Sequence, residues 1–305
     1  MGSSTHHYNQ VIDKRLTNRS HNATIASQSG HNTPMPELPE VETTCRGIAP
    51  AVRSRRIAAV VVREHRLRWP LPKNFASLLQ GQTIRDVNRR AKYILLDATD
   101  GTLIAHLGMS GSLRVLPADA ALLPHDHVDI VLDSGMCLRF NDARRFGSMH
   151  WTTDDPSRHA LLKNLAPEPL GDEFDAAYLF GKTRRRKVAI KQLLMNANVV
   201  VGVGNIYASE ALFRSGVRPT RPAGRVTQQE IVRLVKAVKA VLHAAIRAGG
   251  TTLRDYVNAD GAPGYFRQKL FVYERASDPC RKCKTPIKQL KQGQRSTYYC
   301  PRCQR

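Results

Sequence analysis

A methionine inside the chain is followed at once by a proline and two closely spaced carboxylates, in the segment MPELPE at residues 35–40. A proline that heads a chain is a nucleophile. An N-terminal amine has a pKa of about 7.7–8.0, against about 10.4 for lysine, so it is more often neutral near pH 7. Because the proline amine is secondary, its attack on a sugar carbon gives an iminium with a fixed positive charge, which draws electrons from neighbouring bonds.

In the chain as written, the nitrogen of Pro36 is part of a peptide bond to Met35 and cannot attack anything. We therefore expect Met35 to be the functional start, and its removal to free Pro36. Without this proline, Glu37 and Glu40 would be read as early-turn carboxylates favoured by a helix dipole. Beside Pro36, the catalytic interpretation is favoured.

The six cysteines divide unequally. Cys45 and Cys137 stand alone, whereas two Cys-x-x-Cys pairs with sixteen residues between them lie near the C-terminus, at Cys280, Cys283, Cys300 and Cys303. Two such pairs on a hairpin supply four thiolates and leave no vacant position, so the spacing predicts one structural Zn²⁺. A disulfide is disfavoured by the intracellular context that we expect. Basic residues between the pairs, Arg295 among them, suit a DNA backbone.

The charge of the chain is extreme. Its 305 residues carry a net charge of +22, with a sequence pI near 10.3. Such an excess indicates a polyanionic partner, although a merely solubilising surface is the alternative. The sequence has no apolar run long enough to span a bilayer, and residues 1–34 lack the apolar centre of a signal peptide. We therefore expect a soluble, intracellular protein.

Periodicity predicts the elements that must position these residues. Leu38, Val41, Cys45 and Ile48 form one face of a helix, which would carry the reactive segment. Short β-rich segments without intervening helices follow and favour an antiparallel sandwich or barrel: 57–62, 93–96, 103–107, 113–116, 128–132 and 137–140. The second half is predicted to be helical, at 187–196, at 205–214 and from Thr227 to Gly249.

A glycine-rich turn, VGVGN at residues 201–205, lies between two of the predicted helices. Its amides would lie at a helix N-terminus, which is a favourable place for a phosphate. A dinucleotide fold would need a third glycine where Tyr207 stands, so that interpretation is rejected. Asn205 either caps the helix or contacts a phosphate, and the two roles are compatible.

Taken in order, the motifs resemble those of the formamidopyrimidine-DNA glycosylase family, over residues 35–305. The matching segments are PELPEVET, RRAKYILL, HLGMSGSLR, HDHVDI, NDARRFG, VVGVGNIYASE, GGTTLRDY and the cysteine module. Ala143 departs from the pattern, because family members often carry proline there. The segment 251–266 resembles the loop that closes over the lesion.

The resemblance implies an α+β, two-lobed fold: an N-terminal antiparallel β-sandwich opened by a catalytic helix, then a helical domain with a helix-two-turn-helix and a four-cysteine β-hairpin zinc finger. We expect residues 1–34 to be a disordered extension or a mis-assigned start. The expected domains are a catalytic sandwich at 35–155, a linker at 156–171, a helix-two-turn-helix domain at 172–271 and a zinc finger at 272–305.

The resemblance also implies the activity, which is a bifunctional glycosylase and lyase acting as a monomer on duplex DNA with oxidised purines or abasic sites. Pro36 would be the nucleophile, Glu37 the acid that helps to open the sugar ring, and Lys92 and Arg295 phosphate ligands at the lesion. The implied DNA-binding residues are Glu40, Met109, His125, Arg144, Phe146, Lys191 and Asn205. Without the family, Lys92 would be an ordinary surface lysine, and Met109 and Phe146 would be core residues.

Two rival functions stay open. The endonuclease VIII class uses the same chemistry on oxidised pyrimidines, but PELPE, together with Met109, Arg144 and Phe146, favours the purine enzyme. A non-catalytic protein that binds damaged DNA is the other rival, if residues 1–34 are retained.

Overall fold

The computed structural model describes residues 36–251 and 269–305. The expected extension at 1–34 and all but Thr251 of the expected lesion loop at 251–266 lie outside this range. All described residues belong to one unit, Thr33–Arg305. Among them, none of the helices combines the length and the apolar character needed to cross a membrane.

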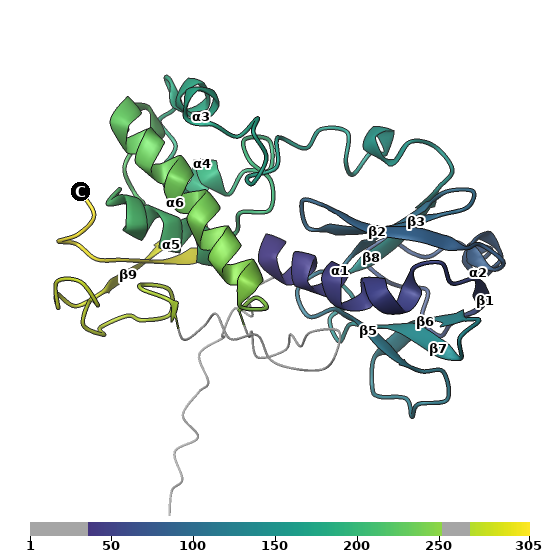
Figure 1. Cartoon of the computed structure of the whole chain (residues 1–305). Helices are drawn as coiled ribbons and strands as arrows, with labels where there is room; N and C mark the ends of the chain where they lie inside the picture. The colour runs from purple at the N-terminus through teal and green to yellow at the C-terminus, as the bar shows by residue number, and fades with distance from the viewer. Residues whose placement is uncertain (1–35, 252–268) are drawn as a thin grey trace, which may run out of the picture. The chain divides into compact units, whose positions relative to one another are not determined.

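The first helix, α1 (Leu38–Val52), confirms the predicted amphipathic segment. All four residues of the predicted apolar face are buried, with Leu38, Val41 and Ile48 fully inaccessible and Cys45 only 5% exposed. This face packs on β2 (Ile84–Arg90) and on α6 (Gln228–Arg247), so α1 joins the sheets to the helical part of the chain (Figure 1). Its N-terminal end is thereby placed between the two parts.

Two four-stranded antiparallel sheets follow α1. The first has the order β1-β6-β7-β5, with β1 at Ile57–Val62, β6 at Asp126–Leu132, β7 at Met136–Asn141 and β5 at Ser112–Pro117. The second has the order β2-β3-β4-β8, with β3 at Tyr93–Ala98, β4 at Thr102–His106 and β8 at Ser148–Thr152. Apolar residues from both sheets pack into one core with α1, as expected for a sandwich.

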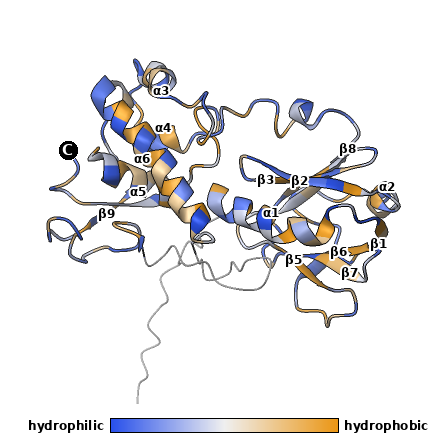
Figure 2. Ribbon diagram, in the orientation of Figure 1, coloured by the Kyte–Doolittle hydropathy of each residue, from blue (hydrophilic) through white to orange (hydrophobic). Residues whose placement is uncertain are grey.

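The second half of the described chain is helical, as predicted. Its elements are α3 (Ala176–Thr183), α4 (Ile190–Leu194), α5 (Asn205–Ser215) and α6, with the short α2 (Phe75–Leu79) lying earlier and two 3-10 turns at Pro156–Arg158 and Ala223–Arg225. Thr227 and Glu230 form the predicted capping box at the start of α6. Hydrophobic and hydrophilic residues alternate along α6 (Figure 2), and its apolar face joins the same core.

The C-terminal module is a two-stranded hairpin, β9 (Lys288–Gln292) and β10 (Arg295–Tyr299), with Arg295 paired to Gln292 at the turn. Its small core packs around Phe213 of α5 and includes Cys280 and Cys300. The last residues are tied back by backbone hydrogen bonds, from Arg305 N to Gly216 O (3.0 Å) and from Arg218 N to Arg305 O (2.9 Å). The hairpin is therefore docked on the C-terminal end of α5.

Candidate active site

The head of α1 carries a buried carboxylate. Pro36 is buried, and Glu37, which follows it, is 2% exposed. The Glu37 carboxylate accepts hydrogen bonds from the backbone amides of Gly204 (2.8 Å), Ile206 (2.9 Å) and Tyr207 (3.3 Å) at the start of α5. The positive end of the α5 dipole therefore faces this acid and fixes it beside Pro36.

The glycines of the glycine-rich turn leave the space that the head of α1 occupies. Gly204 is the N-cap of α5, and a Cβ there would overlap the carboxyl carbon of Glu37. Gly202 has φ +76°, and a Cβ there would lie 2.6 Å from the Leu38 side chain. One amide of the turn, that of Gly204, and two amides of the first turn of α5 donate to a protein carboxylate. This differs from the expectation that amides at this helix N-terminus hold a phosphate.

Glu40 lies behind Glu37 in a fully buried network. Its carboxylate accepts from the backbone amide of Glu37 (3.0 Å), the Tyr207 hydroxyl (2.5 Å) and the backbone amide of Thr251 (2.8 Å). Burial raises the pKa of Glu37, against the opposing charge of Lys92. Burial, followed by repulsion from Glu37, raises the pKa of Glu40 to about 7. Burial and the repulsion between the two carboxylates therefore favour the retention of a proton by Glu40 near neutral pH.

This raised pKa predicts a measurable pH dependence of stability. A folded-state pKa of about 7, against 4.5 as the ordinary value, stabilises the folded protein fully below pH 4.5, and this contribution is lost as the pH rises through 7. Glu40→Gln, which cannot titrate, should therefore lose less unfolding free energy between pH 5 and pH 8 than the wild type, by about 1–3 kcal/mol. Urea unfolding at both pH values measures the difference, and equal losses in the two proteins would contradict it.

Three cations lie in or next to the electrostatic environment of Glu37: Lys92 and Lys191 interact with it, and Arg295 interacts with these two lysines. Lys92 is half-buried in the turn between β2 and β3, and Arg295 is exposed at the start of β10. Burial lowers the pKa of Lys92, the negative charge of Glu37 opposes this, and the positive charge of Arg295 adds to it. The same two charges act on Lys191 of α4. The structure thus brings four residues predicted from separate motifs into one electrostatic cluster.

Lys191 joins this cluster to the hairpin. Its side chain is almost fully buried, and its ammonium donates to Asn205 Oδ1 (2.6 Å), Thr297 Oγ1 (2.7 Å) and Ser296 O (3.2 Å). Burial lowers its pKa to about 7, opposed by the charge of Glu37 and assisted by that of Arg295. Asn205 does not cap α5 with its side chain, because it is the first helical residue and its side-chain oxygen Oδ1 accepts from Lys191.

Two neighbouring loops present a second group of predicted residues. Met109 lies in the loop between β4 and β5, whereas Arg144 and Phe146 lie in the loop between β7 and β8. Phe146 is 41% exposed rather than a core residue, and the Arg144 guanidinium lies 4.8 Å from the centre of its ring. His125, in the loop before β6, is also exposed and has φ 72°.

The four cysteines of the hairpin suit a metal ion. Their sulfurs all lie within 4.8 Å of one another, with 3.9 Å between those of Cys280 and Cys303 and 3.4 Å between those of Cys283 and Cys300. Zn–S bonds of about 2.3 Å in a tetrahedron place sulfurs roughly 3.8 Å apart, so the arrangement fits one structural Zn²⁺. Cys45 and Cys137 are buried elsewhere and lie outside this cluster.

Sequence reasoning missed residues that hold the site together. In the sequence, Tyr207 served only to reject a dinucleotide-binding fold, because it stands where that fold needs a glycine. In the structure, its hydroxyl contacts both Glu40 and Thr251. Glu210, fully buried on α5, accepts from the backbone amides of residues 271–273 and fixes the chain ahead of the hairpin. Its place in the VVGVGNIYASE motif was the available signal.

A sheet sandwich whose first helix presents a buried acid near cationic side chains, next to a helical module and a four-thiolate hairpin, defines a DNA-processing enzyme with a zinc finger. Family profiles agree in three consecutive segments. Residues 35–149 match the formamidopyrimidine-DNA glycosylase N-terminal domain, 165–257 its H2TH domain, and 277–305 the zinc finger found in FPG and IleRS. The chain belongs to the formamidopyrimidine-DNA glycosylase family.

Individual relatives support this assignment along most of the chain. Formamidopyrimidine-DNA glycosylases from Thioalkalivibrio sulfidiphilus and Methylococcus capsulatus are 59% and 55% identical over 271 residues, which cover 89% of this chain and all of each relative. The MutM (Fpg) crystal structure from Thermus thermophilus superposes with a TM-score of 0.80 at 38% identity, covering 88% of this chain and 98% of that one. A Lactococcus lactis Fpg bound to DNA with an abasic site superposes with a TM-score of 0.83 at 30% identity, covering 88% and 99%.

Proposed function

We propose that this protein is a bifunctional DNA glycosylase and abasic-site lyase that removes oxidised purines, namely 8-oxoguanine and formamidopyrimidines, from duplex DNA in base excision repair. One observation carries the proposal. A proline at the head of α1 precedes a buried acid that lies within electrostatic reach of Lys92 and Lys191, and Arg295 acts on both lysines. Structural neighbours bound to DNA containing Fapy-dG or an abasic site support the choice of substrate.

The first chemical step belongs to Pro36. Its free secondary amine attacks the anomeric carbon of the damaged nucleotide, so that a nitrogen–carbon bond forms and the glycosidic bond breaks. Opening of the sugar ring then yields the iminium. Glu37 supplies the proton to the ring oxygen, because burial raises its pKa and so favours its protonated form.

Two eliminations complete the reaction. The iminium withdraws electrons, so loss of a proton from the adjacent sugar carbon expels the 3′ phosphate, and a second elimination expels the 5′ phosphate. A gap of one nucleotide remains. Lys92 and Arg295 hold the phosphates that flank the flipped nucleotide, and Lys191 and Asn205 fix the hairpin that carries Arg295.

Residues of the two loops, of which Met109 is half-buried and Arg144 and Phe146 are exposed, hold the rest of the duplex. Met109 and Phe146 replace the stacking lost when the base is extruded, and Arg144 hydrogen-bonds the orphaned cytosine. His125 and Glu40 complete the DNA-binding set, Glu40 from behind Glu37. The protein acts as a cytoplasmic, nucleoid-associated monomer, and its net charge of +22 favours the DNA polyanion.

Borohydride trapping on paired substrates tests the proposal. A chain that begins at Pro36 should become covalently attached to a duplex containing 8-oxoguanine opposite cytosine when the iminium is reduced, and it should cleave a thymine-glycol duplex more slowly. A preference for thymine glycol would instead identify the endonuclease VIII specificity. Tight binding of the lesion duplex without any trapped adduct would support the non-catalytic alternative.

A further inference from the structure

We infer that Asp142 is a positioning residue that holds Met109, Arg144 and Phe146 in one arrangement before DNA is bound. This inference rests on the DNA-contacting roles proposed above for those three side chains. Asp142 follows β7 and is fully buried. Within the described part of the chain, it makes no hydrogen bond to the residues of the Pro36 site. Its carboxylate faces the two loops instead.

The carboxylate connects both loops through charge-assisted hydrogen bonds. Its Oδ1 accepts from the Ser110 hydroxyl (2.8 Å) in the Met109 loop and from the backbone amide of Arg144 (3.3 Å). Its Oδ2 accepts from the backbone amide of Gly147 (2.7 Å), directly after Phe146. One buried anion thus fixes the residue after Met109 and both ends of the Arg144–Phe146 segment.

The loops also touch backbone to backbone, which leaves them no room to shift independently. A Cβ at Gly108, which has φ +68°, would lie 2.5 Å from both the Gly147 nitrogen and the Phe146 carbonyl carbon. A Cβ at Gly147 would lie 2.6 Å from the Phe140 ring and 3.0 Å from Asp142 Oδ2. Two glycines therefore allow the close approach, and Asp142 satisfies the amide that this approach buries.

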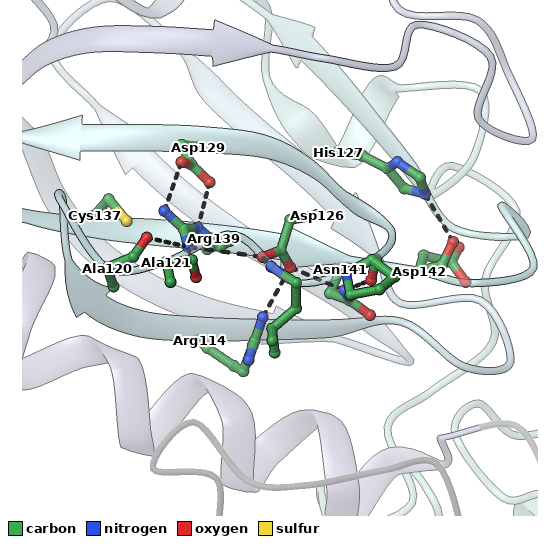
Figure 3. Close-up of polar contacts among 12 residues, drawn as sticks. Arg114, Ala120, Ala121, Asp126, His127, Asp129, Cys137, Arg139, Asn141 and Asp142 are labelled. Carbon is green, nitrogen blue, oxygen red and sulfur yellow. Dashed lines mark hydrogen bonds and ion pairs between the residues drawn. The ribbon is translucent and has the colours of Figure 1, made fainter. Parts of the chain in front are cut away.

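The sheet fixes Asp142 from behind. Its backbone amide donates to His125 O (3.1 Å), and the ring nitrogen Nε2 of His127 lies 2.8 Å from its backbone carbonyl oxygen. Figure 3 shows His127 of β6 reaching toward Asp142, next to a buried charge network in which Arg139 pairs with Asp129 on neighbouring strands. The anchor of the loops is thus held directly at the end of β7, by residues of β6 and of the loop before it.

Removal of the carboxylate should loosen all three side chains together. Asp142→Ala leaves the Gly147 amide and the Ser110 hydroxyl without their acceptor, so the loops must move to solvate them. Arg144 would then meet the orphaned base in many orientations. Discrimination between bases depends on such oriented contacts, so we expect the preference for cytosine over adenine opposite the gap to shrink by roughly tenfold.

The measurement is the affinity for a duplex with a tetrahydrofuran abasic analogue opposite cytosine or adenine, which requires no reaction at Pro36. Asp142→Asn keeps an acceptor for one loop and should give an intermediate preference. Borohydride trapping on an abasic single strand, which has no opposite base, should change less than about twofold. Asp129→Asn is the matched control, because it removes an equally buried carboxylate of the same sheet that contacts neither loop.

The possible results separate this inference from the proposed chemistry. An unchanged cytosine preference in Asp142→Ala, or an equal loss of preference in Asp129→Asn, would overturn the positioning role. A large loss of trapping on the abasic single strand would also overturn it, because the defect would then be general. A wild-type chain that prefers cytosine but forms no adduct would overturn the lyase proposal alone.

Discussion

A chain that retains residues 1–35 is expected to form no borohydride-trapped adduct and to cleave abasic DNA at least roughly 10³-fold more slowly than a chain that begins at Pro36. In the longer chain the nitrogen of residue 36 is an amide, whose lone pair is delocalised into the carbonyl group. In the shorter chain it is a secondary amine, which is substantially neutral near pH 7. The chemistry of a single atom therefore decides activity.

The two chains should have the same fold, so a difference in activity between them reports on the nitrogen of Pro36 alone. Between described residues, the contacts that fix the head of α1 use the backbone amide and carboxylate of Glu37 and the carboxylate of Glu40, and none of them uses the nitrogen of Pro36. Thermal unfolding and DNA affinity should therefore be similar in both proteins. Activity is best measured together with intact mass, so that each active species is assigned a first residue.

Pro36→Gly in the short chain is the matched variant. Glycine offers a primary amine at the same place but neither the secondary nitrogen nor the fixed ring, so lyase activity should fall while binding persists. Full lyase activity in Pro36→Gly would contradict the role of the proline. Active enzyme whose mass includes residues 1–35 would contradict the requirement for a free amine.

The elements that could be predicted from sequence are those with a clear apolar face or a high content of β-branched apolar residues. Strand β1 was predicted with its observed bounds, because valine and isoleucine dominate it. Strand β2 was missed, because four of its seven residues are charged. Arg89 and Arg90 look like loop residues in sequence but pair with Glu168, a partner that lies nearly eighty positions away.

The site was predictable where its chemistry is local and unpredictable where it depends on distant partners. Pro36 and Glu37 are adjacent, so their pairing is visible in a short motif. The partners of Glu37 are amides about 170 positions later, and those of Glu40 include Thr251, so only the folded chain reveals them. Asp142 was within a recognised motif, yet only the approach of two loops shows what its carboxylate does.

Loss of the zinc ligands is expected to lower the affinity for lesion duplex by roughly 10²-fold, because two cations of the site, Arg295 and Lys191, depend on the hairpin for their position. The hairpin has few buried apolar residues of its own, packed around Phe213, so four thiolates and a metal must supply much of its stability. When the hairpin loosens, Arg295 leaves the cluster, and Lys191 loses Thr297 and Ser296 as acceptors. An ammonium buried without acceptors destabilises its surroundings, so the damage should reach α4 and α5.

Cys280→Ser and Cys137→Ser provide a matched pair of variants, since both thiols are fully buried but only Cys280 belongs to the four-sulfur cluster. The Cys280 variant should lose bound zinc, measured by metal analysis, and should lose duplex affinity at least as far as Arg295→Ala does, measured by fluorescence anisotropy. The Cys137 variant should keep both. Full affinity in zinc-free protein would show that the hairpin holds Arg295 without the metal. Retained affinity in Arg295→Ala, with loss in Cys280→Ser, would place the contribution of the finger in its support of Lys191 rather than in a phosphate contact.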